Sequence, residues 1–186
     1  MEITSKRQRP SKKLKLMTRQ FEFITGNDKL TSALKQMLDF INDNLVANVP
    51  AINLLFKSKI ILTELLTNAL KHSFSRSTLI DVTVEKNCIV ITKTDYGMPL
   101  SLIAYANSSV NKIPITNDIL HTLYAIPEGK NTVRFGCEES TLDDLESIER
   151  IVEHFGLIII TKAADKFAYN YCEETKANKF TATLSF

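Results

Sequence analysis

The clearest pattern in the chain is a helical spacing of apolar residues in its first half. Between Leu30 and Val46, after the turn-forming Gly26-Asn27-Asp28, apolar side chains recur every three or four residues and predict an amphipathic helix. Pro50 interrupts this spacing. The spacing resumes from about Ile52 to Ser73 and predicts a second, longer helix, with an apolar face made of Ile61, Leu62, Leu65, Leu66, Ala69 and Leu70.

Alternating apolar and polar residues predict strands on both sides of these helices. Gln20–Thr25 is expected to form a strand before the first helix. Leu79–Glu85 and Cys88–Thr94 alternate more clearly, and only two residues separate them, so we expect a β-hairpin. Three further strands are predicted to close the chain, at Leu157–Lys162, Phe167–Cys172 and Lys179–Phe186.

The segment between the hairpin and the closing strands has a mixed pattern. It predicts short helices at Leu100–Ala106 and Ile119–Leu123, and a longer helix from Leu142 to His154 that Phe155-Gly156 would end. Helices grouped with an antiparallel sheet indicate an α+β fold. We therefore expect a two-layer α/β sandwich, with the helices on one face of a mostly antiparallel mixed sheet, and not a doubly wound parallel fold.

Composition indicates a single globular domain with a core of its own. The chain has 186 residues, of which 44% are hydrophobic, and its apolar runs are too short to span a bilayer. No apolar signal region follows the basic N-terminal segment, so we expect no secretory peptide. The three cysteines, Cys88, Cys137 and Cys172, are widely spaced and predict reduced thiols in a cytoplasmic protein.

Positive charge is concentrated at the N-terminus. Residues 1–20 contain seven Lys or Arg and one acidic residue, whereas the net charge of the whole chain is only +2, so the rest of the chain is acidic. We interpret residues 1–19 as a basic tail before a domain at 20–186. Such a tail can touch nucleic acid, anionic lipid or an acidic partner, or can simply be a solvated terminus. Because the remainder is acidic and no aromatics interleave with the basic residues, we do not expect nucleic acid as the partner.

The second predicted helix has a polar face that could carry chemistry. Glu64, Asn68 and His72 are spaced four residues apart, with Thr67 and Lys71 beside them. Periodicity alone would make this an ordinary solvated helix face.

Two motifs change that interpretation. The run from Glu64 to His72 (E-L-L-T-N-A-L-K-H) resembles the N-box of the histidine kinase-like ATPase (GHKL) superfamily, especially its anti-sigma-factor serine-kinase branch. Asp95-Tyr96-Gly97-Met98-Pro99 resembles the D-x-G-x-P form of the G1 box, and it follows the predicted hairpin as it does in that branch. The resemblance covers about Gln20 to Phe186 and implies the Bergerat ATP-binding fold.

The resemblance also assigns roles to individual side chains. It implies that Asn68 is a ligand of Mg²⁺, which prefers oxygen donors, and that Glu64 is the general base. It implies that Lys71 offsets phosphate charge and that Asp95 accepts a hydrogen bond from the adenine amino group. Gly97 would let the base approach the backbone.

The later glycine boxes of the superfamily, which precede its last helix, are not matched. We align them with Val133–Ser140, which contains one glycine, and the acidic Asp143, Asp144 and Glu146 that follow would repel a triphosphate. Two hypotheses follow. The chain is an ATP-binding regulatory protein with protein serine kinase or ATPase activity, or it is a degenerate member that acts as a nucleotide-independent interaction module. Both imply a regulatory protein partner, and a homodimer is compatible with either.

Overall fold

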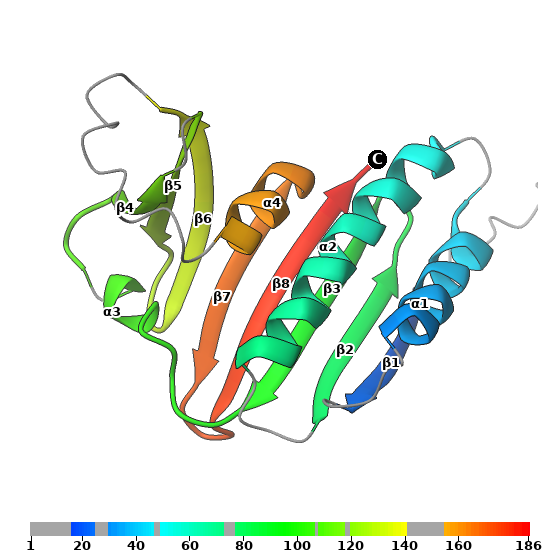
Figure 1. Ribbon diagram of the computed structural model, residues 1–186, viewed down its shortest axis with the longest axis horizontal. Coiled ribbons are helices and arrows are strands. Elements are labelled where there is room, and N and C mark those ends of the chain that lie inside the picture. The colour runs from blue at the N-terminus through cyan, green and yellow to red at the C-terminus, as the bar shows by residue number, and fades with distance from the viewer. Residues whose placement is uncertain are drawn as a thin grey trace, which may run out of the picture.

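The structure, a computed structural model, describes residues 16–24, 30–46, 49–72, 77–106, 108–117, 120–140 and 155–186. Its main feature is an eight-stranded sheet with the order β1-β2-β3-β8-β7-β6-β5-β4 (Figure 1). The strands are β1 (Met17–Ile24), β2 (Ser77–Val84), β3 (Cys88–Tyr96), β4 (Ile113–Asn117), β5 (His121–Pro127), β6 (Thr132–Glu139), β7 (Lys166–Cys172) and β8 (Ala177–Ser185).

Three of the four described helices cover one face of this sheet (Figure 1). They are α1 (Leu30–Asn44), α2 (Ala51–His72) and α4 (Phe155–Ala163), whereas the short α3 (Ile103–Ala106) lies beside β5 and β6. The other face carries hydrogen-bonded polar pairs across neighbouring strands, such as Thr92 with Thr181 and Gln20 with Asp81. The sheet therefore has one packed face and one polar face, as antiparallel sheets commonly do.

The predicted fold class, a Bergerat sandwich with helices on a mixed sheet, is wrong. All seven strand pairings are antiparallel, and among the described residues more lie in strands than in helices. One cause is the connection between β1 and β2. This connection contains two helices, α1 and α2, so the chain runs along the helical layer in one direction and back in the other. It therefore enters β2 antiparallel to β1.

The elements predicted before residue 97 are confirmed, with small shifts at their ends. The predicted basic tail lies mostly outside the described residues, but β1 begins inside it, at Met17. The predicted hairpin is formed by β2 and β3, which pair antiparallel from Leu79 with Thr94 to Val84 with Ile89. The last two predicted strands are confirmed as β7 and β8.

Predictions in the middle of the chain fare less well. The helix expected at Ile119–Leu123 is wrong, because β5 begins at His121, and β4 and β6 were not expected. The strand expected at Leu157–Lys162 is also wrong, because α4 occupies it. Phe155 and Gly156 are the first residues of this helix. The helix predicted at Leu142–His154 and its acidic residues lie outside the described residues.

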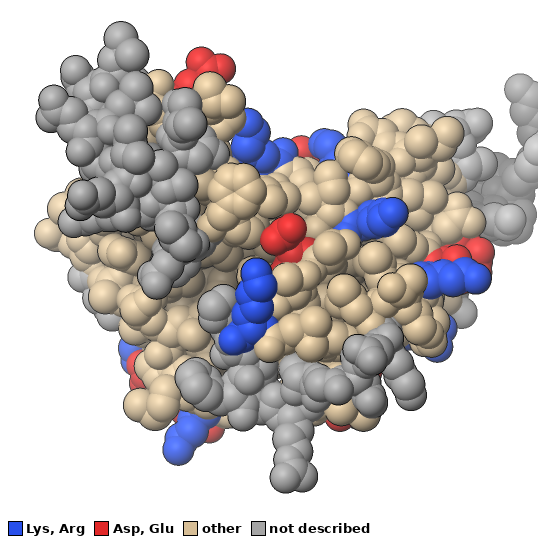
Figure 2. Space-filling model, in the orientation of Figure 1, with Lys and Arg blue, Asp and Glu red and all other residues tan. Residues whose placement is uncertain are grey.

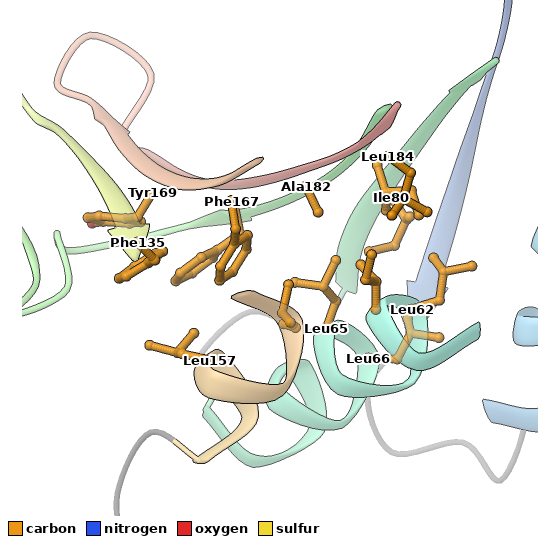
Figure 3. Packing of buried hydrophobic residues seen from close by; sticks show 14 of the residues in the cluster. Leu62, Leu65, Leu66, Ile80, Phe135, Leu157, Phe167, Tyr169, Ala182 and Leu184 are labelled. Carbon is orange, nitrogen blue, oxygen red and sulfur yellow. The ribbon is translucent and has the colours of Figure 1, made fainter. Parts of the chain in front are cut away.

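The core lies between the helices and the sheet. Leu62, Leu65 and Leu66 of α2 are at most 1% exposed and face the β2 and β8 side chains (Figure 3). Under α4, the rings of Phe135, Phe167, Tyr169 and Phe180 pack with centroid separations of 4.9–6.0 Å, and Leu157 covers them (Figure 3). This packing fixes α2 and α4 side by side on the sheet. None of the described helices combines the length and the apolar character needed to cross a membrane.

Candidate functional site

The predicted polar face of α2 points away from the sheet. Leu65 and Ala69 are buried against the sheet, whereas Glu64 and Asn68 are partly exposed and Lys71 is exposed. Glu64 and Asn68 lie four residues apart, and therefore one helical turn apart on the same face. Within α2 the structure thus presents the predicted carboxylate and carboxamide together.

Gly156, which was predicted to end a helix and not to belong to the site, lies directly against these two side chains. A Cβ atom placed on Gly156, in the first turn of α4, would be 2.8 Å from Glu64 Oε2 and 3.4 Å from Asn68 Oδ1. Only glycine fits here without displacing Glu64. The start of α4 and the polar face of α2 therefore form one cluster. In the sequence, Gly156 stands directly before an apolar run, a pattern that fits the end of one helix as well as the start of another.

Asp95, at the end of β3, is held by two neighbours. Thr78 of β2 donates a hydrogen bond to its Oδ1 over 2.5 Å, and Lys93 forms an ion pair with its Oδ2. Sequence reasoning missed both partners. Lys93 could have been found from the alternation of β3, which places it on the same face as Ile89 and Ile91.

The turn after Asp95 has the backbone conformation that a glycine allows. Gly97 has φ +151°, which side-chain-bearing residues rarely adopt, and a Cβ there would meet no atom within 4 Å. Its N–H donates to the Lys176 carbonyl oxygen over 2.9 Å. The space around Gly97 is therefore open, and its role in letting the adenine base approach the backbone stays a prediction.

A buried polar network fastens the same turn to the sheet. The Leu100 N–H donates to the Tyr169 hydroxyl over 3.0 Å, and that hydroxyl donates to Asn178 Oδ1 over 2.6 Å. The Asn178 Nδ2 group then donates to the Met98 carbonyl oxygen over 3.0 Å. Because Tyr169 and Asn178 lie on neighbouring strands β7 and β8, the position of the turn depends on their pairing.

Replacing Tyr169 by phenylalanine is expected to lower the free energy of unfolding by about 1–3 kcal/mol, because two buried groups lose their partner. Burial raises the pKa of the Tyr169 phenol, so the folded state favours its neutral form. The stability from this group is present below about pH 10 and falls as the pH rises through the raised folded value. Denaturant unfolding between about pH 9 and 12 should show a shallower alkaline loss in Tyr169→Phe. An unchanged slope would contradict this.

The structure places the predicted site residues in two groups. Glu64 and Asn68 meet the start of α4, while Asp95 and Gly97 lie at the end of β3, which reaches the same end of the molecule as the C-terminus of α2 (Figure 1). Lys71 is exposed on the last turn of α2. In Figure 2 this face carries separate acidic and basic groups without an extended patch of one sign. A hollow between β1 and α1 contains none of the predicted site residues.

A scan against protein-family models and a search of curated proteins both find no match for this chain. The site must therefore be judged by its own chemistry. A Cβ atom built on Gly156 would meet Glu64 Oε2 at 2.8 Å, Asn68 Nδ2 at 3.3 Å and Asn68 Oδ1 at 3.4 Å, so a carboxylate oxygen and a carboxamide oxygen both lie near this glycine. Such donors suit Mg²⁺, which commonly binds one or two protein oxygens together with phosphate and water oxygens. In the chemical type of their donor atoms, Glu64 and Asn68 match the ligands that the implied metal prefers. Among the described residues, no group of three or more His, Cys, Asp or Glu side chains could hold a metal ion.

Proposed function

We propose that this chain is an ATP-binding regulatory protein similar to the anti-sigma-factor serine kinases of the GHKL superfamily. Mg-ATP would lie between α2 and the turn after β3. The observation that carries the proposal is the close packing of Gly156, where a Cβ atom would meet both Glu64 and Asn68. It brings the side chains of the N-box-like motif against the start of α4. The proposal rests on these side chains and not on the predicted fold class.

The start of α4 supplies groups that suit a phosphate. The first backbone N–H groups of an α-helix have no partner within the helix, and the helix dipole favours negative charge at that end. Gly156 adds no side chain here, and a phosphate could approach this backbone only if the Glu64 side chain moved aside. In this proposal, phosphate oxygens would accept hydrogen bonds from the first N–H groups of α4, and the Asn68 carboxamide oxygen would be a ligand of Mg²⁺.

The remaining predicted residues have separate tasks in this proposal. Glu64 would accept a proton from an attacking water or serine hydroxyl, and Lys71, on the last turn of α2, would offset phosphate charge. Asp95, held by Thr78 at one oxygen, would accept a hydrogen bond from the adenine amino group through a remaining lone pair. Bound Mg²⁺ would neutralise charge on the phosphates. If phosphate transfer occurs, we expect Glu64→Gln to slow it strongly.

Binding of Mg-ATP is expected to stabilise the folded chain by mass action. At a free concentration one hundred times the dissociation constant, the gain would be about 2.7 kcal/mol and would raise the melting temperature. Differential scanning fluorimetry with millimolar Mg-ATP measures this shift. The Asp95→Asn variant is expected to show a smaller shift. If the wild-type chain shows none at millimolar nucleotide, ATP binding is refuted.

A second candidate function is a nucleotide-independent interaction module. It is favoured by the state of Asp95, both of whose carboxylate oxygens already have protein partners. The adjacent Tyr96 and Met98 are 51% and 83% exposed and could contact a protein. This hypothesis predicts that a regulatory partner binds wild type and Asn68→Ala with equal affinity and that Mg-ATP changes neither. Loss of partner binding in Asn68→Ala would argue against it.

A further inference from the structure

We infer that Lys93 is a second base-reading residue, which donates a hydrogen bond to the ring nitrogen N1 of adenine while Asp95 accepts one from the 6-amino group. The inference rests on the proposed function and names the side chain that would complete purine recognition at the same site. It is carried by the burial of Lys93, by its pairing and by its unused donors.

Lys93 occupies a position that the strand pattern assigns to an apolar residue. On the helix-facing side of β3 it follows Ile89 and Ile91, which are both fully buried. Lys93 itself is only 5% exposed. Burying an ammonium group is costly unless it is paired, and a buried ion pair seldom stabilises a fold more than apolar residues of the same size would. Core packing alone therefore does not explain a lysine here.

The contacts of Lys93 leave part of its hydrogen-bonding capacity unused. An ammonium group has three donors. One is directed to Asp95, and the group also lies 5.5 Å from the ring centroid of Phe180. Among the described residues, Asp95 is its only hydrogen-bond acceptor. A nearly buried cation with spare donors beside a carboxylate is suited to a ligand that presents an acceptor next to a donor.

The Watson–Crick edge of adenine presents this combination. Its 6-amino group is a donor and the neighbouring N1 is an acceptor, so a carboxylate and an ammonium side by side can bind both. Thr78 donates a hydrogen bond to Oδ1 of Asp95, and Lys93 pairs with Oδ2. The carboxylate acceptor therefore lies on the Thr78 side and the ammonium donor on the other. Guanine presents the reverse order, with an acceptor at position 6 and a donor at N1. The pair would therefore favour adenine over guanine more strongly than Asp95 alone.

The test compares ATP with its 1-deaza analogue, which lacks only the N1 acceptor. Affinities of the full chain are measured with Mg²⁺ by calorimetry for wild type, Lys93→Met and the control Lys179→Met, an exposed lysine of β8. Wild type and Lys179→Met are expected to bind the analogue about tenfold or more weakly than ATP, as for a hydrogen bond to a charged group. Lys93→Met is expected to bind ATP more weakly than wild type and to bind ATP and the analogue equally.

The outcomes distinguish failure of the Lys93 role from failure of the proposed ATP binding. If wild type binds ATP and the 1-deaza analogue equally, the role of Lys93 is overturned while ATP binding stands. If wild type binds neither compound at millimolar concentration, the proposed function fails and this inference fails with it. Because the wild-type comparison needs no variant, the inference remains falsifiable even if Lys93→Met does not fold.

Discussion

Replacing Leu65 by alanine is expected to lower the free energy of unfolding by about 2–5 kcal/mol, the range for a buried leucine that leaves a cavity. Leu65 is 1% exposed and lies on the side of α2 that packs on the sheet (Figure 3). Urea unfolding followed by circular dichroism gives the difference directly. The midpoint should fall without a change in the denaturant slope, because the surface exposed on unfolding stays about the same.

Leu70→Ala is a matched control on the same helix. Leu70 is 42% exposed, so the same change of side chain should cost well under half as much as at Leu65. The comparison tests the rotation of α2 about its axis, which also directs Glu64 and Asn68 toward α4. Equal losses at the two positions would mean that α2 does not present the face described here, and the candidate site would have to be abandoned with it.

Replacing Asn68 by alanine is expected to remove most of the affinity that Mg²⁺ adds to ATP binding. Even residues that only support a metal ligand typically contribute about ten- to a hundredfold in metal affinity, so loss of the proposed ligand should cost at least that. The measurement is the ATP dissociation constant with Mg²⁺ and with EDTA. Wild type should bind more tightly with the metal, whereas the variant should bind alike in both conditions.

Thr67→Ala provides the control, since Thr67 precedes Asn68 on α2 and is similarly half-buried. It should keep the difference between Mg²⁺ and EDTA. A variant Asn68→Ala that still binds Mg-ATP as tightly as wild type would remove Asn68 from the site. It would also leave the contact of Asn68 with Gly156 as a packing feature only.

The first half of the fold could be predicted because its patterns are long and regular. The helices α1 and α2 each repeat their apolar spacing over several turns, and β2 and β3 alternate cleanly around a short turn. The orientation of Glu64 and Asn68 follows from the same helical period. Their joint exposure on one face was therefore available from the sequence.

The apolar run at Leu157–Ile160 shows where sequence reasoning fails. Four consecutive apolar residues contain no period that distinguishes a strand from a buried helix. Because three of them are β-branched, their β propensity favoured a strand, whereas the run lies in α4. Because the run was predicted to be a strand, Gly156 was predicted to end the preceding helix, whereas it lies in the first turn of α4. The sequence therefore did not predict that Gly156 packs against Glu64 and Asn68.

The partners of Asp95 could not be predicted for a different reason. Thr78 is 17 positions away along the chain and reaches Asp95 only because β2 and β3 pair in the observed register. The Tyr169 and Asn178 network depends likewise on the pairing of β7 with β8. Such contacts are set by strand register, which a single sequence without homologues does not specify.

The position of β8 between β3 and β7 has a consequence for biosynthesis. On the ribosome, β1, β2 and β3 can pair before β8 has been made, and so can β4, β5, β6 and β7, but only β8 joins the two groups. Until it emerges, β3 and β7 each have an unsatisfied backbone edge, a state that invites mispairing. The turn after Asp95 also lacks its hydrogen bonds to Asn178 and to the Lys176 carbonyl oxygen until those residues have been synthesised. Maturation of the site is therefore expected only after β8 has been synthesised, and a chaperone could assist it.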